Sequence, residues 1–141
     1  MIKTIIIVVS SFILCACDPV YLAEIINNNT EDVFIKVGFN KEELEKSWGI
    51  DKSYIEFLKS YPNWTDISSA VDFDTINLIN TYKIEAGQSF PLSSGIGGYP
   101  DLRLIKFLLI LDEDSTMFEN QEQLINAFEI KDGRHWILEL E

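Results

Sequence analysis

The sequence predicts a mainly β protein: a small antiparallel β-sandwich of immunoglobulin-like arrangement with two or three short helical insertions. Three observations lead to this prediction. Apolar and polar residues alternate along several short segments, turn-favouring residues separate these segments, and helical spacing is confined to short stretches between them. Few strand segments are separated by long helices, so we expect mostly antiparallel pairing. An α+β sheet with its helices on one face is the alternative.

The first two strands are predicted to form a hairpin. Residues 22–27 form the first strand candidate, and the polar run at 27–32 favours a turn. In the second candidate, four apolar side chains share one face at period two: Val33, Ile35, Val37 and Phe39. The opposite face, which carries Phe34 and Lys36, is expected to meet solvent in part.

The chain then changes to helical spacing in two short segments, residues 41–48 and 54–61. Asn40, with Glu43 three residues later, matches a capping box, and Gly49 is placed to end the first helix. Pro62 prevents continuation of the second. Residues 63–74 carry few signals and are expected to form a loop.

The second half of the chain returns to strand patterns, at residues 75–85, 89–92, 102–111 and 135–140. Residues 89–92 are predicted to be a short edge strand, because Pro91 cannot donate to a ladder. Residues 102–111 are apolar on both faces, which predicts a central strand. Thr116, with Glu119 three residues later, predicts the start of a third helix.

The chain is strongly acidic. Its 141 residues include 23 acidic and 11 basic ones, so the formal net charge is −12 at pH 7. Such a surface repels phosphate backbones, and we therefore expect no nucleic-acid partner. Any partner that is steered by electrostatics is expected to be basic.

The first seventeen residues have the layout of a secretory signal. Lys3 precedes an apolar stretch at residues 5–14, which is too short to span a bilayer. The segment Leu14-Cys15-Ala16-Cys17 resembles a bacterial lipobox, with a Leu three residues before the modified cysteine and a small residue just before it. The resemblance implies a signal peptide at residues 1–16 and a lipid on Cys17.

After cleavage, a lipidated tether at residues 17–21 would lead into a single β-rich domain at residues 22–141. Cys15 leaves with the signal, so Cys17 is the one remaining thiol and no intramolecular disulfide is expected. Stability must then come from packing.

Residues 93–100 form a glycine-rich segment that we predict to be a mobile connection and a candidate binding loop. A phosphate loop is disfavoured, because no helix and no Lys-Ser or Lys-Thr pair follows. Five residues are candidates for binding: Gly95, Gly97, Gly98, Tyr99 and Trp64. Trp64 ends a group of aromatic residues whose helical spacing otherwise favours packing against a sheet: Trp48, Tyr54, Phe57, Tyr61 and Trp64.

No catalytic, metal or cofactor site is predicted. His135 is the single histidine and falls in a strand pattern, with no local support for a catalytic triad. The acidic run Asp112-Glu113-Asp114 fails as a calcium loop, since Met117 stands where the tight turn needs glycine and Gln123 where a bidentate Glu belongs. We expect a solvated strand-to-helix turn there.

The chain also resembles the small lipoproteins of Bacteroidetes, in its short leader, its Cys17-Asp18 start, its Asn-rich turn and its late apolar strand ending in acids. The resemblance implies a bacterial envelope protein, lipid-anchored to the outer membrane and facing the periplasm or the cell surface. We expect a binding or accessory protein without enzymatic activity, in adhesion or envelope assembly, with a protein or carbohydrate partner. The alternative is an acidic inhibitor or immunity protein that meets a basic enzyme.

Overall fold

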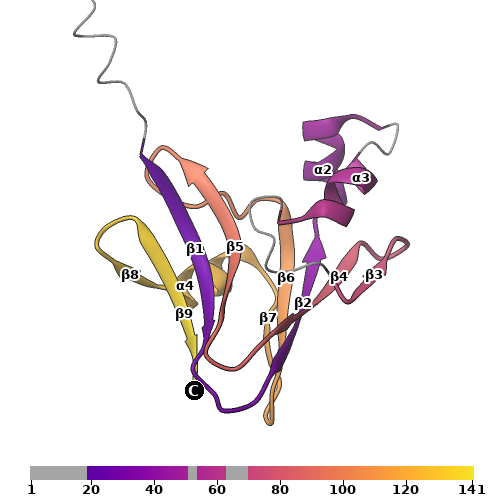
Figure 1. The fold of residues 1–141 in the computed structure, drawn as a ribbon. Coiled ribbons are helices and arrows are strands. Elements are labelled where there is room, and N and C mark those ends of the chain that lie inside the picture. Colours follow the sequence, from indigo (N-terminus) through magenta and orange to yellow (C-terminus); the bar gives the residue numbers. More distant parts are fainter. Residues whose placement is uncertain (1–18, 51–53, 63–69) are drawn as a thin grey trace, which may run out of the picture.

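A computed structural model describes residues 19–50, 54–62 and 70–141, whose strands form two sheets (Figure 1). The four-stranded sheet has the order β5-β1-β9-β8, with bounds Ser89–Ile96, Val20–Asn27, His135–Leu140 and Glu129–Lys131. The five-stranded sheet has the order β3-β4-β2-β6-β7, with bounds Asp72–Asp74, Ile79–Ile84, Val33–Phe39, Ile105–Leu111 and Thr116–Phe118. The described helices are α2 (Lys41–Trp48), α3 (Tyr54–Ser60) and α4 (Gln121–Ala127).

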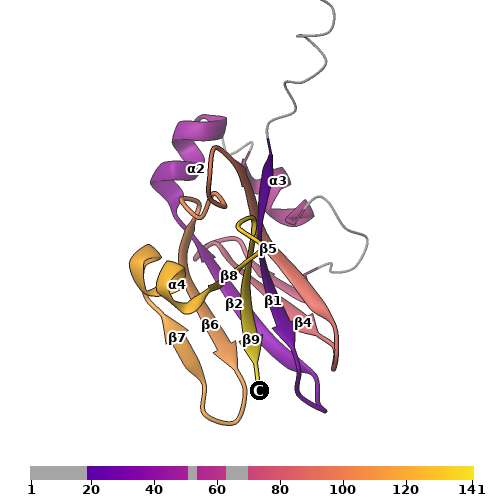
Figure 2. The same cartoon turned by 90° about the vertical axis from the view of Figure 1, so that its left-hand side faces the viewer.

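The predicted β-sandwich with short helical insertions is confirmed, and the α+β alternative is wrong. The sheets converge at the end that holds the β1–β2 connection and diverge toward the start of β1 (Figures 1 and 2). The core takes side chains from both sheets and from all three described helices: Ile25, Phe90, Ile35, Leu108, Leu44, Leu58 and Leu124. Tyr82 and Phe90, one from each sheet, have ring centroids 4.6 Å apart.

The predicted hairpin of residues 22–27 and 33–39 is wrong, because β1 and β2 lie in different sheets. β1 pairs antiparallel with β5 and parallel with β9, whereas β2 lies between β4 and β6. Asn27, fully buried at the end of β1, explains the separation. Its Nδ2 donates to the carbonyl oxygens of Ile84 (3.0 Å) and Glu31 (2.9 Å), and its Oδ1 accepts from the Asn29 amide (3.1 Å). This side chain fixes a crossing between sheets where the sequence suggested a turn.

Helices α2 and α3 are confirmed nearly to the residue. Asn40 Oδ1 accepts from the Glu42 and Glu43 amides at 3.1 and 3.4 Å, and Gly49 ends α2 with φ 89°. Two hydrogen bonds tie α3 and the residue after it to β4. Asn80 Nδ2 donates to the Leu58 carbonyl at 2.8 Å, and the Tyr82 hydroxyl donates to the Tyr61 carbonyl at 2.8 Å. These bonds connect the helical insertion to the five-stranded sheet.

The strand predicted at residues 75–85 begins at Ile79, because residues 75–78 form the turn between β3 and β4. Asp74 Oδ1 accepts from the Ile76 and Asn77 amides at 2.9 and 3.0 Å, and this side chain holds the turn in place. Part of the predicted loop at 63–74 is therefore strand β3, while residues 63–69 lie outside the described residues.

The third helix begins five residues later than the sequence suggested. Thr116 and Phe118 belong to β7, and α4 is capped by Asn120, whose Oδ1 accepts from the Gln123 amide at 3.0 Å. Residues 112–115 are the turn of a β6–β7 hairpin, in which Ser115 has φ 44°. The sequence also missed β8.

Three further strands differ from their predictions only at the ends. β6 is central as predicted, although it starts at Ile105, and β9 matches its predicted bounds. β5 is an edge strand as predicted, but it continues to Ile96. β1 begins at Val20, so the last two residues of the predicted tether already belong to the sheet.

We predict that Asn27→Ala destabilises the protein by about 2–4 kcal/mol, because it leaves the buried Ile84 carbonyl of β4 and two backbone groups of the β1–β2 connection without their partner. Urea-induced unfolding measures this free energy. Asn28→Ala is the control, since the Asn28 side chain is exposed, and should change stability by less than about 0.5 kcal/mol. Equal effects of the two substitutions would contradict the bridging role of Asn27.

Candidate functional site

The predicted binding loop divides into a strand and a turn. Gly95 lies in β5 opposite Tyr21 of β1, and a Cβ atom on Gly95 would lie 2.4 Å from the Tyr99 carbonyl oxygen. This close approach requires glycine. Gly97 and Gly98 have φ of 97° and 113°, in the left-handed region, and form the turn itself. Residues 93–96 therefore belong to strand β5 and not to the predicted connection, whereas Tyr99 follows the strand and is exposed.

Most of the aromatic residues between positions 48 and 64 pack within the protein, as their helical spacing predicts. The rings of Trp48 and Phe57 stack with centroids 4.3 Å apart, and Phe57 meets Tyr61 edge to face at 5.6 Å. Tyr61 is buried, and its hydroxyl donates to the Leu92 carbonyl of β5. Trp64 and Cys17 lie outside the described residues.

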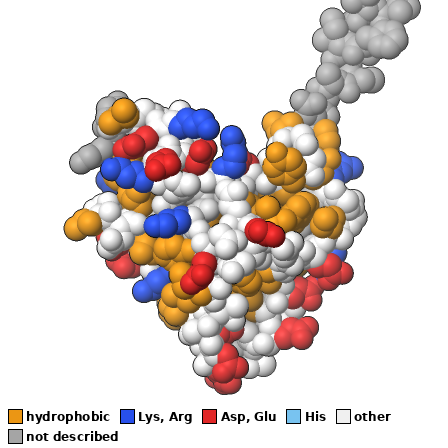
Figure 3. All heavy atoms as spheres, turned by 180° about the vertical axis from the view of Figure 1, so that it is seen from behind, with side chains coloured by type: hydrophobic (Ala, Val, Ile, Leu, Met, Phe, Trp, Pro, Cys, Tyr) orange, Lys and Arg blue, Asp and Glu red, His pale blue; other side chains and the backbone are white. Residues whose placement is uncertain are grey.

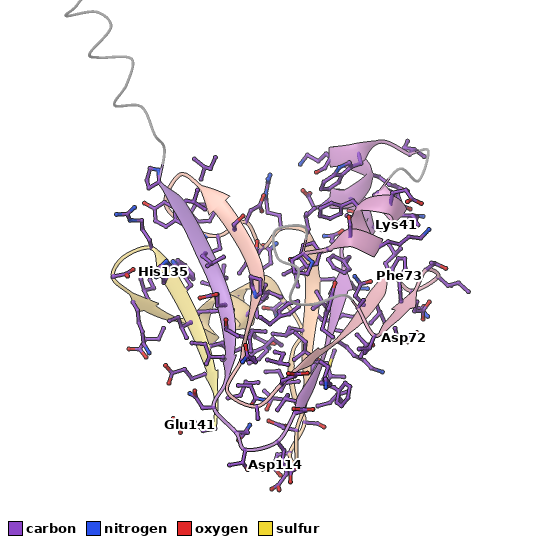
Figure 4. The ribbon with its side chains drawn as sticks, in the orientation of Figure 1. Lys41, Asp72, Phe73, Asp114, His135 and Glu141 are labelled. Atoms are coloured by element: carbon purple, nitrogen blue, oxygen red, sulfur yellow. The ribbon has the colours of Figure 1, made fainter. Side chains whose placement is uncertain are left out.

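An acid-lined hollow of about 350 Å³ lies where the sheets converge. Six of its nine lining residues are acidic: Glu31, Asp32, Asp112, Glu113, Asp114 and Glu141. They come from the β1–β2 connection, the β6–β7 turn and the residue after β9. Asp114 and Glu141 are labelled at this end in Figure 4. We call this surface the acidic hollow.

One of the six carboxylates is neutralised by a neighbouring cation. Lys83 Nζ lies 3.1 Å from Asp32 Oδ2 and 3.3 Å from Glu85 Oε1, and the Ala86 amide donates to Asp32 Oδ1 at 3.2 Å. The hydrogen bond from Lys83, aided by that from Ala86, lowers the pKa of Asp32 below its usual value. Across the described part of the chain, the other five acids of the hollow make no ion pair within 4.0 Å.

This arrangement is suited to binding a cationic group. Five unpaired carboxylates on one surface attract positive charge and repel anions. Among the residues that the structure describes, no cluster of three or more His, Cys, Asp or Glu side chains could hold a metal ion. The hollow is thus a candidate docking surface for basic side chains of a partner.

Sequence reasoning found half of this hollow. It singled out Asp112-Glu113-Asp114 but assigned these residues to a strand-to-helix turn. It gave no role to Glu31, Asp32 or Glu141, which are distant in the chain. A usable signal exists: each acidic group directly precedes or follows a predicted strand, although the sheet arrangement is needed to show which strand ends meet.

His135 lies at the start of β9, far from the acidic hollow (Figure 4). Its Nδ1 is 3.3 Å from Asp132 Oδ2, and both side chains are exposed. The structure thus places this histidine on the strand surface, as predicted, in a pair with the β8–β9 turn.

We predict that acidification weakens the fold partly through Asp32. A carboxylate whose pKa is lower in the folded state contributes stability above the unfolded pKa, about 4, and loses it as the pH falls through the folded pKa. Asp32→Asn should therefore lose less stability between pH 5 and pH 3, as measured by urea midpoints. In a Lys83→Met background the same substitution should have a smaller effect; an undiminished effect would contradict the Lys83 contribution.

No family model matches the chain, and comparisons with curated proteins and with solved structures find no match either. Within residues 19–50, 54–62 and 70–141, no helix is long and apolar enough to cross a membrane.

Proposed function

We propose that this protein is a lipid-anchored binding protein of the bacterial cell envelope, which presents the acidic hollow to a basic partner and performs no catalysis. The support for the anchor is the leader, with its apolar stretch and its lipobox-like segment ending at Cys17. A diacylglyceryl group joined to Cys17 through a thioether would hold the domain on the membrane, since each buried methylene of its acyl chains contributes about 0.8 kcal/mol.

The proposal rests mainly on one observation: β1 begins at one end of the domain, and the acidic hollow lies at the other end. β1 begins at Val20, just after the segment that leads from Cys17, and runs to Asn27 beside the hollow. Its eight residues span about 23 Å at the usual rise of a strand. A domain held at Cys17 would therefore carry the hollow at the end remote from its point of attachment.

The chemistry of the hollow favours a protein partner with exposed Lys and Arg side chains. Carboxylates that lack internal cations are free to pair with such residues, and complementary charge accelerates encounter. An accessory role in adhesion or envelope assembly fits this surface. A carbohydrate partner has less support, because Phe57 and Tyr61 pack within the protein and leave Tyr99 as the exposed aromatic residue of the candidate loop.

A second candidate is an inhibitor or immunity protein that covers the active site of a basic enzyme. The observation that favours it is again the acid lining of the hollow, since an acidic surface can fill a cationic cleft. The two roles differ in one measurable property. An inhibitor abolishes the enzymatic activity of the protein that it captures, whereas an assembly factor leaves that activity unchanged.

We predict that Cys17→Ser abolishes lipidation, because serine lacks the thiol that forms the thioether. Metabolic labelling with a radioactive fatty acid measures this. Wild-type protein should carry label and fractionate with membranes, while the variant should carry none. Unchanged labelling of Cys17→Ser would overturn the anchor.

We predict that Asp112→Asn/Glu113→Gln/Asp114→Asn lowers capture of the partner from an envelope extract by at least about tenfold, because three charges are lost from the binding surface. Added salt should weaken wild-type capture. The matched control Glu42→Gln/Glu122→Gln/Glu129→Gln removes the same charge at exposed positions away from the hollow, and should bind as wild type. Equal losses in the two triple variants would show that net charge alone governs binding and would refute the hollow.

A further inference from the structure

Three exposed apolar side chains gather where the chain enters the fold. Val20, Ile96 and Tyr99 are 59%, 68% and 61% exposed. Val20 and Ile96 are opposite each other in the β1–β5 ladder, so their side chains share one face, and the backbone of Tyr99 folds against Gly95. Hydrophobic side chains gather at the end of the molecule where β1 begins (Figure 3). We call these three residues the apolar tip.

The two chain segments that form the apolar tip contain no charged residues. Residues 89–100 contain no Asp, Glu, Lys, Arg or His, and neither do residues 19–23. Charged residues lie close to these segments, among them Asp101, which pairs with Arg103 at 2.7 Å, and Arg134, whose carbonyl oxygen accepts from the Leu22 amide. Tyr99 combines an apolar ring with a polar hydroxyl, a composition that is enriched at membrane–water interfaces.

Only a short segment of chain separates the apolar tip from the proposed lipid, and this indicates that the membrane itself covers the tip. Cys17 and Val20 are three residues apart, which is at most about 11 Å of extended chain. The headgroup layer on one side of a bilayer is about 5–8 Å thick. A domain attached through Cys17 therefore has its apolar tip within a few ångströms of the headgroups.

We propose that the apolar tip inserts into the headgroup region of the membrane that holds the lipid anchor, and so fixes the orientation of the domain. This inference rests on the proposed lipidation of Cys17 and adds a second contact to it. The acyl chains supply attachment, and Val20, Ile96 and Tyr99 supply a fixed direction. The β1 axis then stands away from the bilayer and the acidic hollow lies at its far end.

The test is amide hydrogen exchange on the full lipidated protein in vesicles of phosphatidylethanolamine and phosphatidylglycerol at 3:1. Peptides that cover residues 96–99 should exchange about tenfold more slowly on vesicles than in the unlipidated Cys17→Ser protein in buffer. Peptides that cover the β3–β4 turn at residues 75–78 should exchange equally in both.

A double variant separates the tip from the anchor. Ile96→Ser/Tyr99→Ser should still sediment with the vesicles through its lipid, yet lose the slow exchange of residues 96–99. Ile76→Ser is the matched control, because Ile76 is 89% exposed in the β3–β4 turn of the other sheet. This control should retain the protection.

The outcomes distinguish this inference from the proposed function. Acylated, vesicle-bound protein whose tip exchanges as fast as in buffer would overturn the membrane contact alone. Absence of acyl groups on Cys17 would overturn the proposed anchor and this contact together. Protection that appears only after envelope extract is added would place a protein on the tip, and would also overturn the membrane contact.

Discussion

The fold depends on the place where the chain crosses between its two sheets, and Asn27 stabilises that place. Its buried carboxamide joins β1 of one sheet to the Ile84 carbonyl of β4 in the other and to the Glu31 carbonyl of the β1–β2 connection. Its backbone adds two bonds, donating to the Gln88 carbonyl at 2.9 Å and accepting from the Gly87 amide at 2.8 Å. The chain crosses between the sheets from β1 to β2 and from β4 to β5, and both crossings meet at Asn27. This residue forms hydrogen bonds with backbone groups that have no partner within either sheet.

The crossing also determines where charge lies. The sheets converge at this end, so the β1–β2 connection and the β6–β7 turn are brought together, and both are rich in carboxylates. Lys83 neutralises Asp32, which lines the acidic hollow, whereas the turn at residues 112–114 keeps its negative charges. At the opposite end the β1–β5 pair ends in uncharged residues. The described domain therefore carries the acidic hollow at one end and the exposed side chains of Val20, Ile96 and Tyr99 at the other.

At the diverging end, the helical insertion is hydrogen-bonded to both sheets. The Tyr61 hydroxyl bonds to β5, whereas Tyr82 and Asn80 of β4 bond to the backbone of α3 and of the residue after it, so the insertion links both sheets. Within the described residues, Asn80 Oδ1 is the buried side-chain atom that lacks a hydrogen-bond partner. The same side chain donates to two buried acceptors, and this explains an amide on an otherwise apolar strand face.

The sequence by itself determined the local structures whose causes are close in the chain. Alternation identified β2 and β9, a run that is apolar on both faces identified β6, and the capping side chain of Asn40 with Gly49 bounded α2, because period and capping act within a few residues. It also singled out the glycine-rich segment that contains Tyr99 and three of the six acids of the hollow. Only the tertiary structure decided that β1 and β2 separate, that Thr116 continues a hairpin, and that distant acids share one surface. Strand pairing depends on which faces become buried together, and that contact energy belongs to residues far apart in the chain.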